Sequence, residues 1–129
     1  MARSRSSQPT EVELQILRIL WELGAAPVRE IHARLTKAKD TNYSTTVKML
    51  SVMRDKGLLT RDEKARPHFY RTAESQDDTQ RSVLAAVIEK LYDGSAKSLV
   101  LQALSSQKTS REDRAEIRRL INELEGRKS

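Results

Sequence analysis

Residues 43–71, YSTTVKMLSVMRDKGLLTRDEKARPHFYR, predict one helix followed by a short β-hairpin. The helix is expected to begin with Ser44 as its N-cap and to end at Gly57, which suits the C′ position. Two short strands follow, 58–61 and 68–71, with a charged turn between them. The helix carries one apolar stripe whose spacing is typical of a buried face: Thr46, Met49, Leu50 and Met53.

Two further helices are predicted before this stretch. A capping box starts the first one at Thr10, and Gly24 ends it. A second helix of about two turns spans residues 28–35, with Arg29 and His32 on its exposed side. Three short helices followed by a β-hairpin is the order of elements in a winged helix–turn–helix.

Beyond residue 73 the pattern changes to amphipathic helices only. About 56 residues with so few large side chains would form a poor core alone, so each apolar stripe needs a partner. We expect the same segment of a second chain to be that partner, which gives a two-fold dimer. A monomeric helical subdomain is the alternative. The residues expected at the dimer contact are Val83, Val87, Leu91, Leu99, Ile117, Leu120, Ile121 and Leu124.

The predicted fold class is mostly α with a small β-hairpin, a winged helix–turn–helix followed by an α-helical dimerisation arm. The expected parts are a flexible basic N-terminus (1–9), a DNA-binding domain (10–73) and a helical dimerisation region (74–129). The net charge of +6 follows this division, because 14 Lys and Arg face 8 Asp and Glu up to Ala73 and the remainder is balanced. A basic module is typical of a protein with a polyanion partner, most often nucleic acid. The alternative is that the charge only keeps a small protein soluble.

Several kinds of chemistry are excluded by residues that the sequence lacks. It has no cysteine, which excludes disulfides, thiolate zinc sites and cysteine nucleophiles. Its two histidines lack the spacing of a metal site, and its four glycines cannot build a phosphate-binding loop. We therefore expect no enzyme, no cofactor and no metal. No apolar run is long enough to cross a bilayer, and no apolar stretch follows the basic start, so we expect no secretory signal. We therefore expect a cytoplasmic protein without direct membrane association.

The helix within 43–71 is the predicted DNA reader. A helix in the major groove presents its N-terminal residues to base edges. Hydroxyl groups can serve either type of base, Lys48 suits guanine, and Val47 can pack on a thymine methyl group. Phosphate contacts around the groove fix the register but carry no sequence information. The expected base contacts are Ser44, Thr45, Val47, Lys48 and Ser51, and the expected phosphate contacts are Arg29, His32, Tyr43, Lys64, Arg66 and His68.

The stretch from Asn42 to Leu59 also resembles the BlaI/MecI family of penicillinase repressors. The resemblance spans about residues 10–125 and includes the strand His68–Arg71 and the arm segment Lys97–Leu101. It implies a dimeric winged-helix repressor that binds palindromic operators whose half-sites contain TACA/TGTA-like sequence.

The resemblance also implies how repression ends. In this family a membrane-bound zinc metalloprotease sensor triggers cleavage of the arm, after an S-L-V-L segment and between Asn and Phe. The matching pair here is Gln102 and Ala103, so the chain departs from the family at the possible cleavage site. The related copper-responsive repressors carry a C-terminal cysteine hook, and its absence here disfavours copper sensing.

Two alternative functions remain open at this point. A MarR-type ligand-responsive winged-helix regulator needs a pocket between the reader and the dimer helices, and the aromatic-poor arm offers little to line one. A winged-helix protein–protein interaction module would not need the excess positive charge of the first 73 residues, and it would select no operator from random DNA.

Overall fold

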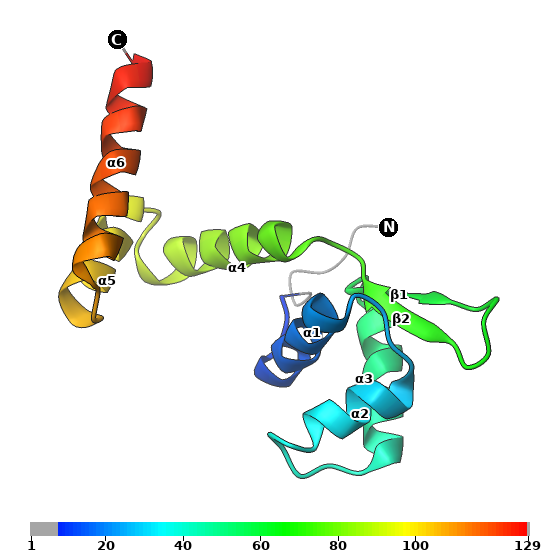
Figure 1. The fold of residues 1–129 in the computed structure, drawn as a ribbon. Helices are drawn as coiled ribbons and strands as arrows, with labels where there is room; N and C mark the ends of the chain where they lie inside the picture. The colour runs from blue at the N-terminus through cyan, green and yellow to red at the C-terminus, as the bar shows by residue number, and fades with distance from the viewer. Residues whose placement is uncertain (1–7, 129) are drawn as a thin grey trace. The chain divides into compact units, whose positions relative to one another are not determined.

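The computed structural model describes residues 8–128, so most of the segment expected at residues 1–9 lies outside the described residues. The predicted order of a winged helix–turn–helix followed by further helices is confirmed (Figure 1). The chain divides between Val83 and Leu84 into two compact units. The elements are α1 (Glu11–Leu23), α2 (Val28–Leu35), α3 (Tyr43–Asp55), β1 (Leu59–Asp62), β2 (Phe69–Thr72), α4 (Gln76–Leu91), α5 (Ala96–Ser106) and α6 (Arg111–Lys128).

Helix α1 begins and ends as the sequence predicts. The Thr10 hydroxyl accepts a hydrogen bond from the Glu13 amide at 3.2 Å, and the Glu13 carboxylate accepts one from the Thr10 amide at 3.0 Å. These two bonds satisfy amides that the first turn of a helix leaves free. Gly24 caps the other end with φ of 86°, a backbone conformation that residues with a Cβ rarely adopt.

Helix α3 starts at a different cap from the one expected. Asn42 is the N-cap, and its side-chain oxygen accepts a hydrogen bond from the Thr45 amide at 2.8 Å. Ser44 lies inside the first turn, where its hydroxyl donates to the same Asn42 oxygen at 2.9 Å. The prediction of Ser44 as the N-cap is therefore wrong, because Asn42 is the residue placed to reach the third amide of the helix. Gly57 follows the helix with φ of 84°, as predicted.

One apolar core holds the first three helices and the hairpin together. Leu50 and Met53 of the predicted stripe belong to this core, and Met49 packs partly buried against it. Full burial of an Ile or Leu side chain stabilises a fold by about 1.5–3 kcal/mol, so this core fixes α3 by its inner face. The buried apolar residues are Ile16, Leu17, Leu20, Ala26, Ile31, Leu35, Leu50, Met53, Leu59 and Tyr70, with the buried Thr46 beside them.

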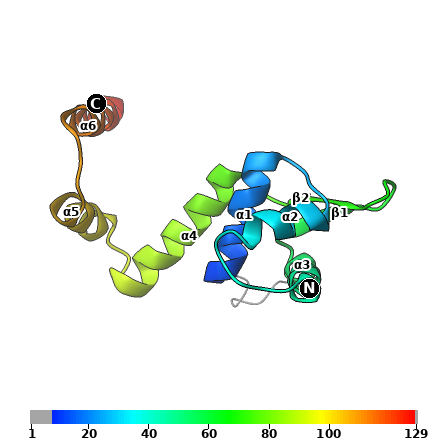
Figure 2. The ribbon, with the colours of Figure 1, turned by 60° about the horizontal axis from the view of Figure 1, so that its bottom comes forward.

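The two predicted strands are present, each one residue later than expected. β1 and β2 pair antiparallel, from Leu59 opposite Thr72 to Asp62 opposite Phe69. The shift arises because the amide of Leu58 donates to the carbonyl of Met53 at 2.9 Å and so belongs to the helix cap. The hairpin projects from the three helices in both Figure 1 and Figure 2.

The base of the hairpin is joined to the loop before α2. The backbone groups of Ala26 and Tyr70 exchange two hydrogen bonds, of 3.0 and 2.8 Å. This isolated antiparallel β-bridge ties the start of α2 to β2. Together with the burial of Tyr70 in the core, it holds the wing beside the helix–turn–helix.

The helices after the hairpin have capped N-termini but bury almost nothing. Ser95 accepts a hydrogen bond from the Ser98 amide, and Ser110 and Asp113 form a reciprocal box at the start of α6. Of the described side chains from residue 80 to residue 127, none is buried. Within residues 8–128, no helix combines the length and apolar character needed to span a bilayer.

Candidate nucleic-acid interface

The outer face of α3 is exposed along its whole length. The core packs against the opposite face of the helix, so this outer face is left open to solvent. All five predicted base-contacting residues lie on it, and Tyr43 opens it. Among the described residues up to Val83, the exposed large apolar side chains all lie on α3. They are Tyr43, Val47 and Val52.

His32 lies half-buried between α2 and α3, which corrects its expected place on an exposed side. Its Nδ1 and the Oγ1 of Thr46 are 2.8 Å apart and share a hydrogen bond. Its ring also lies against the Tyr43 ring in a T-shaped arrangement, with centroids 5.4 Å apart. Thr46 is fully buried, and a buried hydroxyl needs a partner. His32 therefore joins the two helices of the helix–turn–helix.

Three predicted phosphate contacts line one hollow. It has a volume of about 200 Å³ and lies where the N-terminus of α2, the start of α3 and the base of the wing meet. Arg29 comes from α2, Tyr43 from α3 and His68 from the wing. The positive end of the α2 dipole lies at the same place, so an anion is favoured there. The remaining lining residues are Pro27, Val28, Pro67 and Tyr70.

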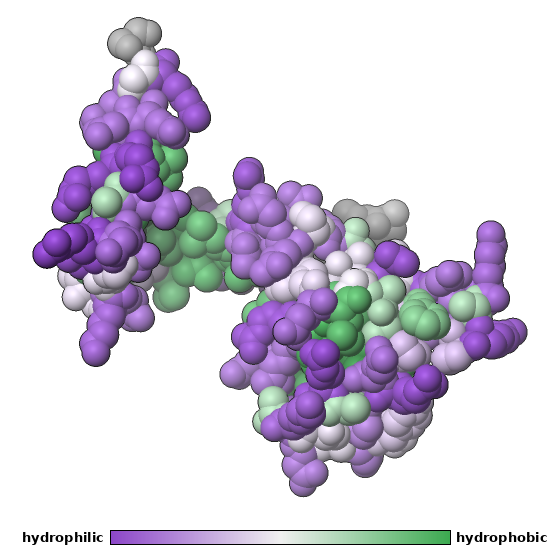
Figure 3. Space-filling model, in the orientation of Figure 1, coloured by the Kyte–Doolittle hydropathy of each residue, from purple (hydrophilic) through white to green (hydrophobic). Residues whose placement is uncertain are grey.

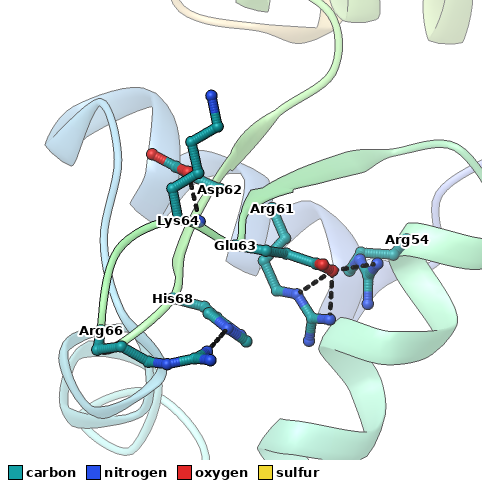
Figure 4. A network of polar contacts seen from close by, with 7 residues as sticks. All are labelled: Arg54, Arg61, Asp62, Glu63, Lys64, Arg66 and His68. Carbon is teal, nitrogen blue, oxygen red and sulfur yellow. Dashed lines mark hydrogen bonds and ion pairs between the residues drawn. The ribbon is translucent and has the colours of Figure 1, made fainter.

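The tip of the wing carries the other two predicted phosphate contacts. Lys64 and Arg66 are both exposed. The Lys64 amide donates to the Asp62 carboxylate at 3.0 Å, and the Arg66 guanidinium donates to Nε2 of His68 at 2.5 Å. In Figure 4 the Lys64 ammonium points away from the other labelled side chains. The wing therefore offers two cations to a surface that approaches its tip.

The structure also contains an ion-pair network that the sequence analysis did not find. One oxygen of Glu63 accepts hydrogen bonds from Nε and Nη2 of Arg61, at 3.1 and 2.5 Å, and lies 3.5 Å from Nη2 of Arg54 (Figure 4). The hydrogen bond with Arg61 lowers the pKa of Glu63 and raises the pKa of Arg61. Arg61 and Glu63 are two residues apart at the end of a strand, a spacing that places side chains on one face. This two-residue spacing is the sequence signal from which the contact between Arg61 and Glu63 could have been predicted.

The residues predicted for dimerisation remain on the surface of the arm. Leu91 is 76% exposed and Leu120 is 54% exposed. Figure 3 shows apolar surface gathered along the C-terminal half of α4. The other six are exposed (Ile121, Leu124) or half-buried (Val83, Val87, Leu99, Ile117).

The predicted cleavage pair lies in the arm. Gln102 and Ala103 are exposed residues within α5. Across the part of the chain that the structure describes, no group of three or more His, Cys, Asp or Glu side chains could hold a metal ion.

Comparison with known proteins identifies the family. The family model described as penicillinase repressor matches residues 9–123. The penicillinase repressor of Staphylococcus aureus is 23% identical over 112 residues, 87% of this chain and 89% of that protein. The penicillinase repressor of Bacillus licheniformis is 23% identical over 121 residues, 94% of each chain. The methicillin resistance regulatory protein MecI of Staphylococcus aureus (strain N315) is 21% identical over 119 residues, 92% of this chain and 97% of that protein. Because the match covers most of its length, the chain belongs to the penicillinase repressor family and is a transcriptional repressor rather than an enzyme.

Proposed function

We propose that this repressor binds palindromic operator DNA as a homodimer, in the cytoplasm, with α3 of each protomer in the major groove. The observation that carries the proposal is the position of α3. Its inner face is held by the core, and its outer face is exposed from Tyr43 onward. A rigid, one-sidedly exposed helix that follows a helix and a turn is what major-groove reading requires.

The base contacts come from the first three turns of α3. Lys48 donates to guanine O6 or N7, and Val47 packs on a thymine methyl group. Ser44, Thr45 and Ser51 offer hydroxyl groups, which can form hydrogen bonds with either type of base. Ser44 already donates to Asn42, so it is available to the DNA mainly as an acceptor.

The phosphate contacts come from around the hollow and from the wing. Arg29, Tyr43 and His68 converge on one concavity from three elements, which supports a single backbone phosphate seated there. Lys64 and Arg66 reach the backbone beside the wing. His32 has Nδ1 engaged with Thr46, so only its Nε2 is left for a phosphate.

The region from residue 74 to the C-terminus is the proposed dimerisation arm. Among the residues that the structure describes, no side chain from residue 80 to residue 127 is buried. The arm therefore lacks a core of its own. Burial of apolar surface contributes about 25 cal/mol per Å², so pairing with a second arm would stabilise both. Two readers, each within residues 10–73, then bind two half-sites with high effective concentration.

The proposed switch is cleavage of the arm between Gln102 and Ala103. The family resemblance supports a membrane-bound zinc metalloprotease sensor as the partner that triggers it. Both carbonyl groups are engaged in the helix, since the Ser106 hydroxyl donates to Gln102 at 2.7 Å and the Gln107 amide donates to Ala103 at 3.1 Å. α5 must therefore unwind locally before the bond can be cut. Loss of the arm would remove the dimer while leaving the reader intact.

Selection of bound sequences from random duplex DNA tests the proposal. We expect a pseudo-palindromic site with two half-sites about one helical turn or a multiple of it apart. A pool that shows no enrichment would contradict operator binding. It would instead favour the winged-helix protein–protein interaction module.

A further inference from the structure

We propose that Arg54 and Arg61 form a binding site for one backbone phosphate of duplex DNA, and that the carboxylate of Glu63 occupies this site in the free protein. The proposal rests on the proposed function. It adds two cations to the expected interface and gives an acidic residue of the wing a role in setting affinity.

The geometry is that of an anion held between two guanidinium groups. Arg61 donates two hydrogen bonds to one oxygen of Glu63, and Arg54 approaches the same oxygen at 3.5 Å. The planar guanidinium fork suits both carboxylates and phosphates. Any site that holds this carboxylate between two arginines is therefore also shaped for a phosphate oxygen.

The site lies between the two parts of the proposed interface. Arg54 is in the last turn of α3, and Arg61 is on β1. Glu63 begins the turn that continues to Lys64, a predicted phosphate contact. A duplex that contacts the outer face of α3 and the tip of the wing passes the segment that joins them. Figure 4 shows the guanidinium groups of Arg54 and Arg61 on the two sides of the Glu63 oxygen.

Exposure allows the carboxylate to be exchanged for a phosphate. The Glu63 side chain is 55% exposed, and those of Arg54 and Arg61 are 33% and 25% exposed. Solvent-exposed ion pairs are individually weak, so a polyanion that also binds neighbouring cations can displace one of their members. The displaced Glu63 would then face the DNA as a free negative charge.

Glu63 therefore lowers the affinity for DNA of every sequence, because the site reads only the backbone. Glu63→Gln should loosen the contact with both guanidinium groups, because a neutral amide oxygen is a weaker acceptor than a carboxylate, and it removes the repelling charge. Asp62→Asn is the matched control. It removes the neighbouring negative charge, but Asp62 contacts the Lys64 amide and neither arginine.

The test is a titration of fluorescent duplexes, one random in sequence and one selected operator, from about 50 to 200 mM salt. Glu63→Gln should bind both about three- to tenfold more tightly at the lowest salt, with a plot of log K against log salt steeper by about 0.9, the increment for one phosphate. Asp62→Asn should change affinity less than about twofold, as expected for an exposed charge that holds neither arginine. In an Arg54→Gln/Arg61→Gln background, Glu63→Gln should have no greater effect than Asp62→Asn.

Equal effects of the two neutral variants would overturn the proposal, and so would weaker binding by Glu63→Gln, which would make Glu63 a residue that aligns Arg61. Thermal unfolding followed by circular dichroism checks that the variants fold. If Glu63→Gln does not fold, Glu63→Asp keeps the charge but retracts it by one methylene, and it should give a smaller increase in affinity than predicted for Gln; no increase would count against the site. A wild-type protein that binds no duplex would defeat the proposed function together with this inference.

Discussion

The Glu13 carboxylate accepts a hydrogen bond from the ammonium group of Lys56 at 2.8 Å, although the two residues lie 43 positions apart in the sequence. The same oxygen accepts from the Thr10 amide, so one carboxylate both caps α1 and joins it to the residue that caps α3. The Glu13 side chain is almost fully buried, whereas that of Lys56 is partly exposed. Through this contact the start of α1 helps to fix the end of the helix proposed to read DNA.

Glu13→Ala should destabilise the fold more than other changes of acidic residues in α1. It removes a capping bond and leaves the Lys56 ammonium without this carboxylate. We expect a loss of about 2–3 kcal/mol in the free energy of unfolding, measured by urea denaturation. Glu11→Ala is the control, because Glu11 is exposed in the same first turn and should cost about 0.5 kcal/mol or less. Equal losses for the two variants would contradict the structural role of Glu13.

Lys48→Ala should weaken binding to the selected operator and broaden the sequence preference. One good bidentate contact to guanine contributes about 1–3 kcal/mol of discrimination, and random DNA offers it at few positions. Repeating the selection with the variant measures the change. Val52→Ala is the control on the last turns of α3, where we expect the same consensus as for the wild type. An unchanged consensus and affinity for Lys48→Ala would remove this residue from the base contacts.

Lys64→Ala combined with Arg66→Ala should weaken specific and random DNA to the same degree. Both side chains are exposed at the tip of the wing, where we expect them to neutralise phosphates. The slope of log K against log salt should flatten by about 0.9 for each phosphate that the variant no longer neutralises. Lys37→Ala with Lys39→Ala removes the same charge from the loop before α3 and serves as the control. A double wing variant with the wild-type slope would place the wing outside the interface.

The contribution of Glu63 to stability should depend on pH in a defined direction. The hydrogen bond from Arg61, followed by its charge, holds the pKa of Glu63 below its ordinary value. Such a group stabilises the fold above the pKa of the unfolded chain, about 4.3, and loses the contribution as the pH falls through the folded value. The Tm of the wild type should therefore exceed that of Glu63→Gln near neutral pH, and the difference should shrink to nothing in acid. A difference that grows on acidification would contradict the assigned pKa direction.

Local signals explain what could be predicted from the sequence. The capping box at Thr10 and the positive φ of Gly57 each depend only on a few neighbouring residues in the sequence, and both are where we expected them. Asn42 and Ser44 are equally good N-caps in principle, so composition alone could not choose between them. The long-range contacts could not be predicted in this way, because they depend on residues far apart in the sequence. The burial of His32 depends on Thr46, 14 residues away, and the approach of Arg54 to Glu63 depends on how α3 meets the hairpin.

Leu120→Asp should convert the protein to monomers if the arm dimerises through α6. Leu120 is 54% exposed in the single chain, and a charge placed in an apolar contact would lose hydration without gaining a partner. Asn122→Asp introduces the same charge two residues away on α6, outside the apolar stripe, and should leave the dimer intact. Sedimentation velocity gives the mass of each variant, and circular dichroism shows that the helices are retained. A Leu120→Asp protein that still sediments as a dimer would exclude this part of α6 from the contact, and a wild-type monomer would exclude the dimer itself.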